Sequence, residues 1–306
     1  MILVVGGAGY LGGTVVGEVI HQGKPLRCLV RKGSDTSKLT RDEVELVYGD
    51  VRDKESLKKS LSGVSTVISS FATRINKEPR VSTLWETDYE GNLSLIRLAR
   101  EAGVKKYIFV SYWGLAKFGN FEHGRIKKLV EDLLTVSGLD YTIFRVTTLA
   151  TDMSILLGNR LKKKGWAPMF MKRHERVRPI LLEDLAWCMV DAIENPRASG
   201  RIIEVAGAEE YTFLELQELF RRLLNKKVRF VFLPLPLVKL VASFVDFFTG
   251  NAYNAKGLVS AFTGGSTCDI TEMKEIFRIK QGSFARHLED YLKTGTVIRQ
   301  EPGILK

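Results

Sequence analysis

The chain opens with a short apolar run that breaks into a glycine-rich turn. Residues 1–5 are Met-Ile-Leu-Val-Val, residues 6–12 are Gly-Gly-Ala-Gly-Tyr-Leu-Gly, and a helix-compatible stretch follows to about His21. A buried strand, a glycine turn and a helix form the phosphate-binding unit of a dinucleotide-binding domain. The helix N-terminus offers free N–H groups and a positive dipole end to the phosphates.

The glycines of this turn have separate roles. One permits the tight turn, one lets the backbone approach a pyrophosphate, and one lets helix and strand pack closely. Two spacings fit: Gly-x-Gly-x-x-Gly from residue 7 and Gly-x-x-Gly-x-x-Gly from residue 6. The cofactor-binding residues that the turn predicts are Gly6, Gly9, Tyr10, Leu11 and Gly12.

The second predicted strand, residues 26–30, indicates which nucleotide is bound. Arg31 and Lys32 follow it directly, where an NAD site usually has an acidic residue for the ribose 2′-hydroxyl. A guanidinium can hold a 2′-phosphate through paired charge-assisted hydrogen bonds, whereas a carboxylate would repel it. We therefore predict NADP(H) as the cofactor, and solvated loop charges are the alternative interpretation.

Strand and helix patterns alternate as far as residue 145, which predicts a Rossmann-type doubly wound parallel sheet with helices on both faces. The predicted strands are 1–5, 26–30, 43–48, 65–69, 106–110 and 141–145, and the predicted helices are 10–21, 53–61, 84–102 and 122–137. We assign residues 1–150 to an NADP(H)-binding domain. Residues 151–306 form a smaller C-terminal α/β substrate lobe with some return to the Rossmann core. Ligands of such folds bind outside the carboxyl ends of the strands.

The second half has a looser rhythm. Helices are predicted at 153–164, 183–194, 212–224, 236–248 and 283–292, and strands at 201–205 and 228–232. Residues 230–248 form the most apolar stretch, but Pro234 and Pro236 interrupt it and Lys239 and Asp246 add charge. The stretch is shorter than the roughly 20 apolar residues of a spanning helix. We expect a core helix here, with a peripheral membrane contact through 230–248 as the alternative.

The composition restricts the partners and the compartment. Lysine and arginine exceed acidic residues by 11, which favours anionic partners. Because we find no nucleic-acid motif, we expect no nucleic-acid partner. Cys28, Cys188 and Cys268 lack metal-ligand spacing, so we expect no metal and predict buried thiols in a reducing compartment. A working strand at residue 1 leaves no room for a signal peptide, so we expect a cytoplasmic protein, with a membrane-peripheral location as the alternative.

Several runs jointly resemble the extended and atypical branches of the short-chain dehydrogenase/reductase superfamily. They are residues 6–12, 29–31, 49–53, 88–92, 102–106, 109–111, 141–145 and 178–186. The likeness is strongest to NmrA-like proteins and to the NADPH-binding accessory subunit of respiratory complex I, and it spans residues 1 to about 210.

The resemblance implies roles for further residues of the cofactor site. Asp50 would accept a hydrogen bond from the adenine amino group, and the Val51 backbone would flank the ring. Lys127 would hold the nicotinamide ribose hydroxyls. The ribose side of the site would be lined by Ser69, Ser70 and Phe71.

The catalytic pattern departs from that of the superfamily. Such reductases use a Tyr-x-x-x-Lys pair, in which the tyrosine protonates the substrate oxygen and the lysine lowers its pKa. Glu131 fixes the register at Lys127, and His123 then stands where the tyrosine is expected. Of the usual serine pair, Ser111 is present and Tyr112 replaces the second member.

Three interpretations of the catalytic residues remain open. His123 acts as the acid, since its ordinary pKa near 6.5 suits proton transfer; Tyr112 acts as the acid; or the site is silent and His123 is a surface or capping residue. We expect an NADP(H)-binding oxidoreductase for a small carbonyl or quinone-like substrate. A non-catalytic NADP(H)-binding redox sensor or assembly protein is the alternative. The substrate and the oligomeric state are not determined by the sequence.

Overall fold

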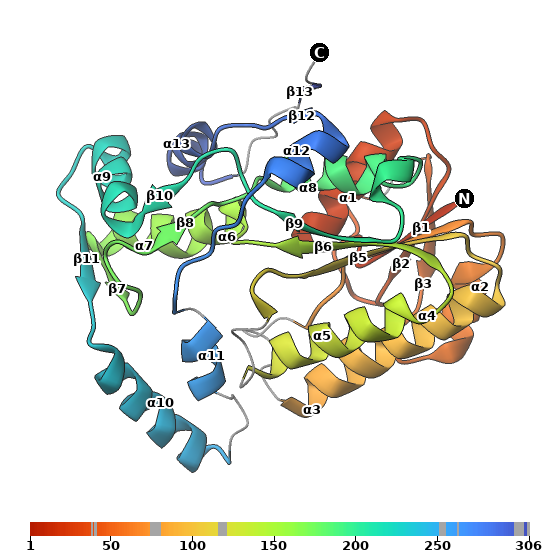
Figure 1. Ribbon diagram of the computed structural model, residues 1–306, viewed down its shortest axis with the longest axis horizontal. Helices are drawn as coiled ribbons and strands as arrows, with labels where there is room; N and C mark the ends of the chain where they lie inside the picture. Colours follow the sequence, from red (N-terminus) through yellow and green to blue (C-terminus); the bar gives the residue numbers. More distant parts are fainter. Residues whose placement is uncertain are drawn as a thin grey trace. The chain divides into compact units, whose positions relative to one another are not determined.

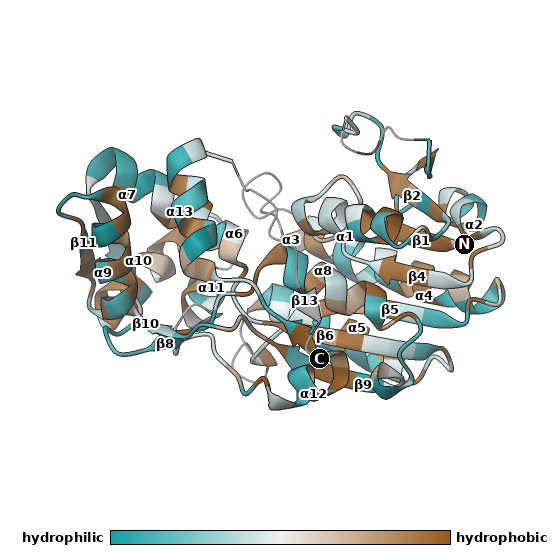
Figure 2. Ribbon diagram, turned by 90° about the horizontal axis from the view of Figure 1, so that it is seen from above, coloured by the Kyte–Doolittle hydropathy of each residue, from teal (hydrophilic) through white to brown (hydrophobic). Residues whose placement is uncertain are grey.

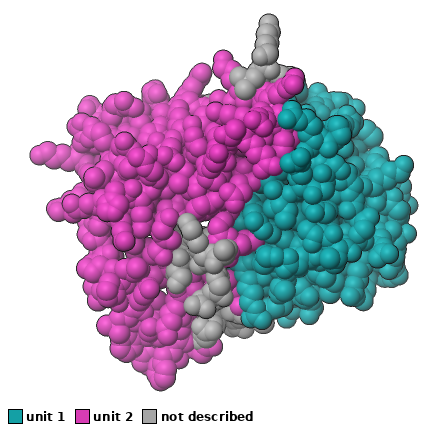
Figure 3. Space-filling model, in the orientation of Figure 1, with its two compact units in different colours: residues 1–112, 123–145, 186–203 teal, residues 113–122, 146–185, 204–306 magenta. Residues whose placement is uncertain are grey.

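The computed structural model describes residues 1–37, 39, 42–73, 81–115, 121–250, 255–261, 263–296 and 303–304. The chain forms two compact units, which are coloured separately in Figure 3. The first unit comprises residues 1–112, 123–145 and 186–203, and the second comprises residues 113–122, 146–185 and 204–306.

A seven-stranded sheet with the strand order β3-β2-β1-β4-β5-β6-β9 carries the first unit. Its strands are β1 (Ile2–Val5), β2 (Leu26–Val30), β3 (Val44–Tyr48), β4 (Thr66–Ser69), β5 (Lys106–Tyr112), β6 (Asp140–Val146) and β9 (Arg201–Val205). The pairs β3–β2, β2–β1, β1–β4 and β4–β5 are parallel. The predicted fold class, an α/β protein with a doubly wound sheet, is confirmed.

Helices cover both faces of this sheet. They are α1 (Tyr10–His21), α2 (Lys54–Leu61), α3 (Val81–Leu84), η1 (Trp85–Glu90), α4 (Gly91–Glu101) and α5 (Glu122–Thr135). Figure 1 shows α2, α4 and α5 on one side of the sheet and α1 on the other. Every residue of β1 and β4 is buried, and the central strands are accordingly hydrophobic in Figure 2. Parallel strands that are covered on both faces require such continuous apolar runs.

The strand order reverses beside β1, and this reversal positions the site. The chain runs outward from β1 to β3 and then returns, so that β4 lies on the other side of β1. The carboxyl ends of β1 and β4 are therefore neighbours with no crossover helix between them, which is where open α/β sheets bind ligands.

Local signals placed two helix starts correctly. The Asp53 carboxylate accepts hydrogen bonds from the backbone N–H groups of Glu55 and Ser56 and so caps α2. Thr212 and Glu215 form a capping box at the start of the helix predicted at 212–224. The helix predicted at 84–102 is interrupted, because residues 85–90 form a π-helical segment. Such wider turns re-aim side chains and occur frequently at functional sites.

The second unit has its own elements and its own core. Its elements are α6 (Ala150–Met153), η3 (Ser154–Gly158), α7 (Asn159–Lys164), β7 (Trp166–Met169), β8 (Arg176–Val177), β10 (Tyr211–Thr212), α9 (Phe213–Leu224), β11 (Arg229–Phe232), α10 (Leu235–Phe248), α11 (Ala255–Ala261), α12 (Thr271–Phe277), β12 (Ile279–Lys280), α13 (Phe284–Thr294) and β13 (Gly303–Ile304). Helix α8 (Leu182–Asp191) begins in the second unit and continues into the first, and η4 (Pro196–Ala198) belongs to the first. Side chains of α6, α9 and α13 pack into one buried cluster. The two-residue strands were not predicted, because two residues are too few to show a period.

The expectation of a core helix at 236–248 was wrong. Only Ala242 and Asp246 of α10 are buried, and most of its large apolar side chains are exposed. No helix among the described residues is long and apolar enough to cross a membrane.

The three cysteines differ in burial. Cys28 and Cys188 are buried as expected, whereas Cys268 is only partly buried. Burial raises the pKa of the Cys28 thiol to about 12, so this thiol is inert near neutral pH.

A buried carboxyl group on α8 leads to a prediction about stability. Asp184 accepts hydrogen bonds from the Gly282 N–H at 3.1 and 3.2 Å, rather than acting as a helix cap. Burial raises its pKa from 3.8 to about 7, and neighbouring Glu183 adds to this. Between these two pH values the folded protein binds more protons than the unfolded chain, so this group makes the protein less stable as pH rises. The difference between the two pKa values corresponds to a loss of about 4 kcal/mol in the free energy of unfolding across this pH range.

Asp184→Asn is therefore expected to stabilise the protein at pH 8 and to flatten the fall in stability between pH 4 and pH 7. The amide oxygen can still accept the hydrogen bond from Gly282, and no charge has to be buried. Urea unfolding at several pH values measures the effect. An Asp184→Asn protein that is less stable than the parent at pH 8 would contradict the assignment.

Candidate dinucleotide site and catalytic cluster

The glycine turn forms a cradle that side chains would fill. The Gly9 N–H donates to the Gly6 carbonyl at 2.9 Å, and α1 begins at the next residue. A Cβ atom on Gly12 would lie 2.1 Å from the Gly6 oxygen, so only glycine fits there. The first turn of α1 contains no acidic residue that would compete for its N–H groups. The turn therefore leaves the N-terminus of α1 open to a pyrophosphate.

The end of β4 completes this cradle from the other side. Ser70 donates to the Val5 carbonyl through both its N–H and its hydroxyl, each at 3.0 Å. Gly6 has a φ of +94°, and a Cβ there would lie 2.9 Å from the Phe71 nitrogen. Ser69 is buried, and its hydroxyl donates to Asn92 at 3.0 Å. Ser70 and Phe71 thus lie beside the glycine turn, whereas the Ser69 hydroxyl is already engaged.

Charged residues gather where β2 and β3 end. Arg31 and Lys32 are exposed immediately after β2. Asp50 accepts hydrogen bonds from Arg52 at its backbone N (2.9 Å), Nε (2.9 Å) and Nη2 (2.8 Å). These bonds lower the pKa of the Asp50 carboxyl, and the nearby positive charge of Arg31 also lowers it. The positive charges of Arg31 and Arg52 therefore both act on the Asp50 carboxylate. Val51 is buried beside them.

His123 is a buried residue rather than a surface or capping residue. It lies in the first turn of α5, and its Nδ1 is 3.7 Å from Oδ2 of Asp88 in the π-helical segment. Asp88 accepts hydrogen bonds from the N–H and hydroxyl of Thr73 at 2.8 and 2.9 Å. Burial, assisted by the Lys127 charge, lowers the pKa of His123 from 6.5 to about 4. Burial raises the pKa of Asp88.

Lys127 lies one turn after His123 and is also buried. Its Nζ donates to the Val110 carbonyl at 2.9 Å and lies 4.5 Å from the centre of the Phe109 ring and 5.9 Å from that of Tyr112. Burial lowers the pKa of Lys127, although the carboxylates of Asp88 and Glu131 oppose this shift. The protonation states of His123, Lys127 and Asp88 therefore influence one another, and the cluster lies beside the end of β5.

The end of β5 supplies the two remaining predicted residues. Ser111 is buried, and its hydroxyl has no hydrogen-bond partner among the described residues. Tyr112 is partly exposed. Glu131, which fixed the register of Lys127 in the sequence, forms a two-pronged ion pair with Arg145 at 3.1 and 2.6 Å. Glu131 therefore anchors α5 to β6.

Sequence reasoning assigned no role to Arg52 and Asp88. Arg52 lies two residues after Asp50. A second cation after the neighbouring strand could have been predicted from the sequence as a further contact for a 2′-phosphate. Asp88 lies in residues 88–92, one of the runs that carry the family resemblance. The direction of its side chain depends on the π-helical segment, which the sequence did not indicate. No group of three or more metal-binding side chains occurs in the described part of the chain.

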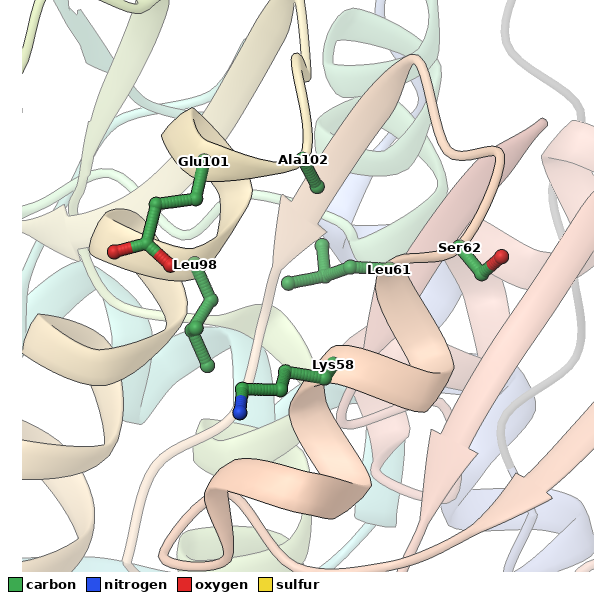
Figure 4. A pocket seen from close by; sticks show the side chains of 6 residues that line it. All are labelled: Lys58, Leu61, Ser62, Leu98, Glu101 and Ala102. Carbon is green, nitrogen blue, oxygen red and sulfur yellow. The ribbon is translucent and has the colours of Figure 1, made fainter.

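One open hollow of about 360 Å³ lies between the C-terminal ends of α2 and α4 (Figure 4). It is lined by Lys58, Leu61, Ser62, Leu98, Glu101 and Ala102. These helix ends lead into the starts of β4 and β5. The hollow is therefore at the amino edge of the sheet, opposite the glycine turn, and is not the dinucleotide site.

The glycine cradle, the strand reversal and the α/β layers define a Rossmann NAD(P)-binding fold of the short-chain dehydrogenase/reductase type. Residues 1–276 match the model of the NmrA-like family, and the chain belongs to this family.

Three known proteins illustrate the similarity. The photosystem II assembly factor Ycf39 of Synechocystis sp. is 27% identical over 310 residues, which cover 98% of this chain and 92% of that protein. The NADPH-dependent quinone oxidoreductase QOR2 of Escherichia coli, solved with NADPH, aligns with a TM-score of 0.75 and 18% identity over 95% of this chain and 99% of that chain. The Citrobacter sp. triphenylmethane reductase, solved with NADP(H), aligns with a TM-score of 0.74 and 20% identity over 97% and 100%. At these identities, the two structures show a shared fold.

Proposed function

We propose that the chain is an NADP(H)-dependent reductase of a small carbonyl or quinone-like substrate. The observation that carries the proposal is the buried cluster of Asp88, His123 and Lys127 at the first turns of α5, in the same unit as the glycine cradle. Coupled titratable groups of this kind are typical of catalytic sites. Two structures of the same fold, a quinone oxidoreductase and a triphenylmethane reductase, were solved with NADPH or NADP(H), which supports the choice of cofactor.

The preference for NADP(H) over NAD(H) rests on Arg31, Lys32 and Arg52. Charge-assisted hydrogen bonds to a 2′-phosphate contribute on the order of 1.5–3 kcal/mol. Arg31→Ala is therefore expected to narrow the ratio of the two affinities by about tenfold or more. Isothermal titration calorimetry with NADPH and with NADH measures the two affinities and hence their ratio.

Lys58→Ala is the matched control for Arg31→Ala. It removes one exposed cation at the opposite edge of the sheet and should leave the ratio unchanged. Equal affinities of the unmodified protein for the two nucleotides would refute the NADP(H) preference.

Reduction of a carbonyl or quinone oxygen requires a hydride and a proton. Bound NADPH supplies the hydride. The residues of this chain must position the substrate oxygen and stabilise the negative charge that develops on it. With a pKa of about 4, His123 is neutral near pH 7, so its ring N–H donates a hydrogen bond to this oxygen, and the proton that completes the reduction is taken up from water. Lys127 keeps the local potential positive, which stabilises negative charge developing on the oxygen.

Asp88 would act as a positioning residue for His123. A protonated Asp88 can donate to Nδ1, which leaves Nε2–H as the donor toward substrate; an ionised Asp88 would draw the proton to Nδ1 and leave Nε2 an acceptor. The raised pKa of Asp88 favours the first arrangement. Thr73 holds the other carboxyl oxygen, so the residue cannot easily turn away.

Replacement of Asp88 distinguishes the two arrangements. In Asp88→Asn the amide oxygen still accepts from Thr73 and the amide N–H₂ faces Nδ1, so we expect most of the turnover to remain. Asp88→Ala should lower kcat about tenfold or more, since the tautomer is no longer fixed. The kcat and KM of both variants are compared with the parent. A severe loss in Asp88→Asn would show that an ionised Asp88 is required.

The proposed function itself is tested by turnover. NADPH oxidation is followed with a panel of quinones, aldehydes and ketones, and NADPH binding is measured separately by fluorescence. Binding together with turnover of any panel member supports the reductase. Binding without turnover favours the second candidate.

The second candidate is a non-catalytic NADP(H)-binding protein that senses redox state or supports an assembly. The observation that favours it is His123 at the position of the expected tyrosine, with its pKa far below neutral. The similarity to Ycf39, named as an assembly factor, supports it. The resemblance to the NADPH-binding accessory subunit of complex I would also fit this candidate. The similar proteins described for this chain are, however, an assembly factor and reductases.

A further inference from the structure

Helix α10 exposes an unusually apolar face. Its exposed large hydrophobic side chains are Leu237, Leu240, Val241, Phe244, Val245, Phe247 and Phe248. Most of them recur at intervals of three or four residues and so form one stripe. The rings of Phe247 and Phe248 are about four-fifths exposed, at 80% and 79%. Single exposed apolar residues are ordinary, but a contiguous patch marks an interaction site.

Helix α10 buries much less of its apolar surface than an ordinary surface helix does. Such helices bury their apolar stripe and turn polar residues to water. In α10 the buried positions are Ala242 and Asp246, and the Asp246 carboxylate accepts from the backbone N–H groups of Ala255 (2.6 Å) and Lys256 (3.0 Å). Asp246 thus fastens α11 beside α10, as Figure 1 shows, and the apolar stripe remains exposed.

Positive charge accompanies this apolar face. Residues 226–261 contain one acidic residue, the buried Asp246, and five basic residues: Lys226, Lys227, Arg229, Lys239 and Lys256. Lys239 is exposed on α10 itself, and Lys256 is exposed on α11. Three more lysines end α7, and the next strand, β7, pairs with β11 directly before α10.

We infer that α10 and its flanking cations form a docking surface for an anionic lipid bilayer. An amphipathic helix with an apolar face and neighbouring lysines binds in the plane of the interface, with its apolar side among the acyl chains. At 14 residues α10 is about 21 Å long, which is short of the roughly 30 Å hydrocarbon core. The helix therefore lies on the membrane rather than across it. Each nearby lysine or arginine adds to the attraction for anionic headgroups.

A bilayer fits this surface better than a second copy of the chain. A twofold interface places each patch against itself, so the exposed Lys239 residues and the basic flanks of both copies would be brought together without compensating carboxylates on this segment. Anionic headgroups supply the missing negative charge at the rim of the apolar face.

Vesicle flotation of the full chain tests the inference. Vesicles of equal parts phosphatidylcholine and phosphatidylglycerol are compared with vesicles of phosphatidylcholine alone, with and without NADPH. The variant is Phe247→Ser combined with Phe248→Ser, and the matched control is Val136→Ser, an 81% exposed apolar residue at the end of α5. Because both phenylalanines are exposed, the double variant should fold normally.

The expected result is binding of the parent to the anionic vesicles, unchanged in Val136→Ser and reduced about tenfold or more in the double variant. Lys239→Glu should weaken binding, and added salt should weaken it further. A Phe244→Trp protein should show blue-shifted emission on the vesicles. Three results would overturn the inference. They are unchanged vesicle binding by the double variant, equal binding of the parent to neutral and anionic vesicles, and a parent protein that is dimeric where the double variant is monomeric. Turnover of NADPH is a separate assay, so either result leaves the reductase proposal independently testable.

Discussion

His123→Ala is expected to lower kcat by about a hundredfold or more, with a smaller effect on KM, once a substrate is identified. A positioned hydrogen-bond donor to the developing oxyanion contributes about that factor, and it acts in the transition state rather than in substrate binding. The kcat of the parent should be nearly flat between about pH 6 and about pH 8, because a group with a pKa of about 4 does not titrate there. Toward lower pH the imidazolium forms, and kcat should rise as long as the protein stays folded. Steady-state kinetics across this pH range check both expectations.

Two companion variants make the His123 result interpretable. His287→Ala removes an equally buried histidine from α13 and reports the cost of losing a buried imidazole away from the cluster. His123→Tyr restores the residue that the superfamily uses and should keep or raise kcat. Unchanged turnover in a folded His123→Ala protein would remove His123 from the mechanism and shift the assignment to Tyr112.

Gly9→Val should abolish NADPH binding and leave a folded protein. Gly9 has a φ of −82°, which any residue can adopt. A Cβ there would lie 3.2 Å from the Gly6 oxygen, so a small shift accommodates it. The branched side chain would occupy the space that the pyrophosphate needs. Calorimetry with NADPH and circular dichroism on the same sample measure the two properties.

Gly12→Ala is the matched comparison, and it should destabilise the fold itself rather than only block the pyrophosphate. Its Cβ would lie 2.1 Å from the Gly6 oxygen and 2.9 Å from the Gly7 Cα, so the turn itself must break. Overpacking of this kind costs about 1–3 kcal/mol or more, and the melting temperature should fall clearly. Normal NADPH binding by a folded Gly9→Val protein would mean that the glycine turn is not the pyrophosphate site.

The sequence by itself determined the first unit in considerable detail. Strand β2 occupies residues 26–30 as predicted, and the helix predicted from residue 53 begins there, with Asp53 as its cap. Such features are readable because strand period, glycine turns and caps depend on residues within a few positions of one another. The glycine cradle belongs to the same group, since its geometry is built from seven consecutive residues.

Only the tertiary structure decided which distant side chains meet. The approach of Asp88 to His123 depends on a π-helical segment and on the packing of α5, and the sheet order brings Phe71 against Gly6. Helix α10 shows the same limit. Its apolar residues predicted burial, but a helix is buried only where another element covers it. In the described structure α11 is bound to α10 through Asp246, and the apolar stripe of α10 is left exposed. Hydrophobic pattern specifies which face prefers to be covered, whereas the fold decides what covers it.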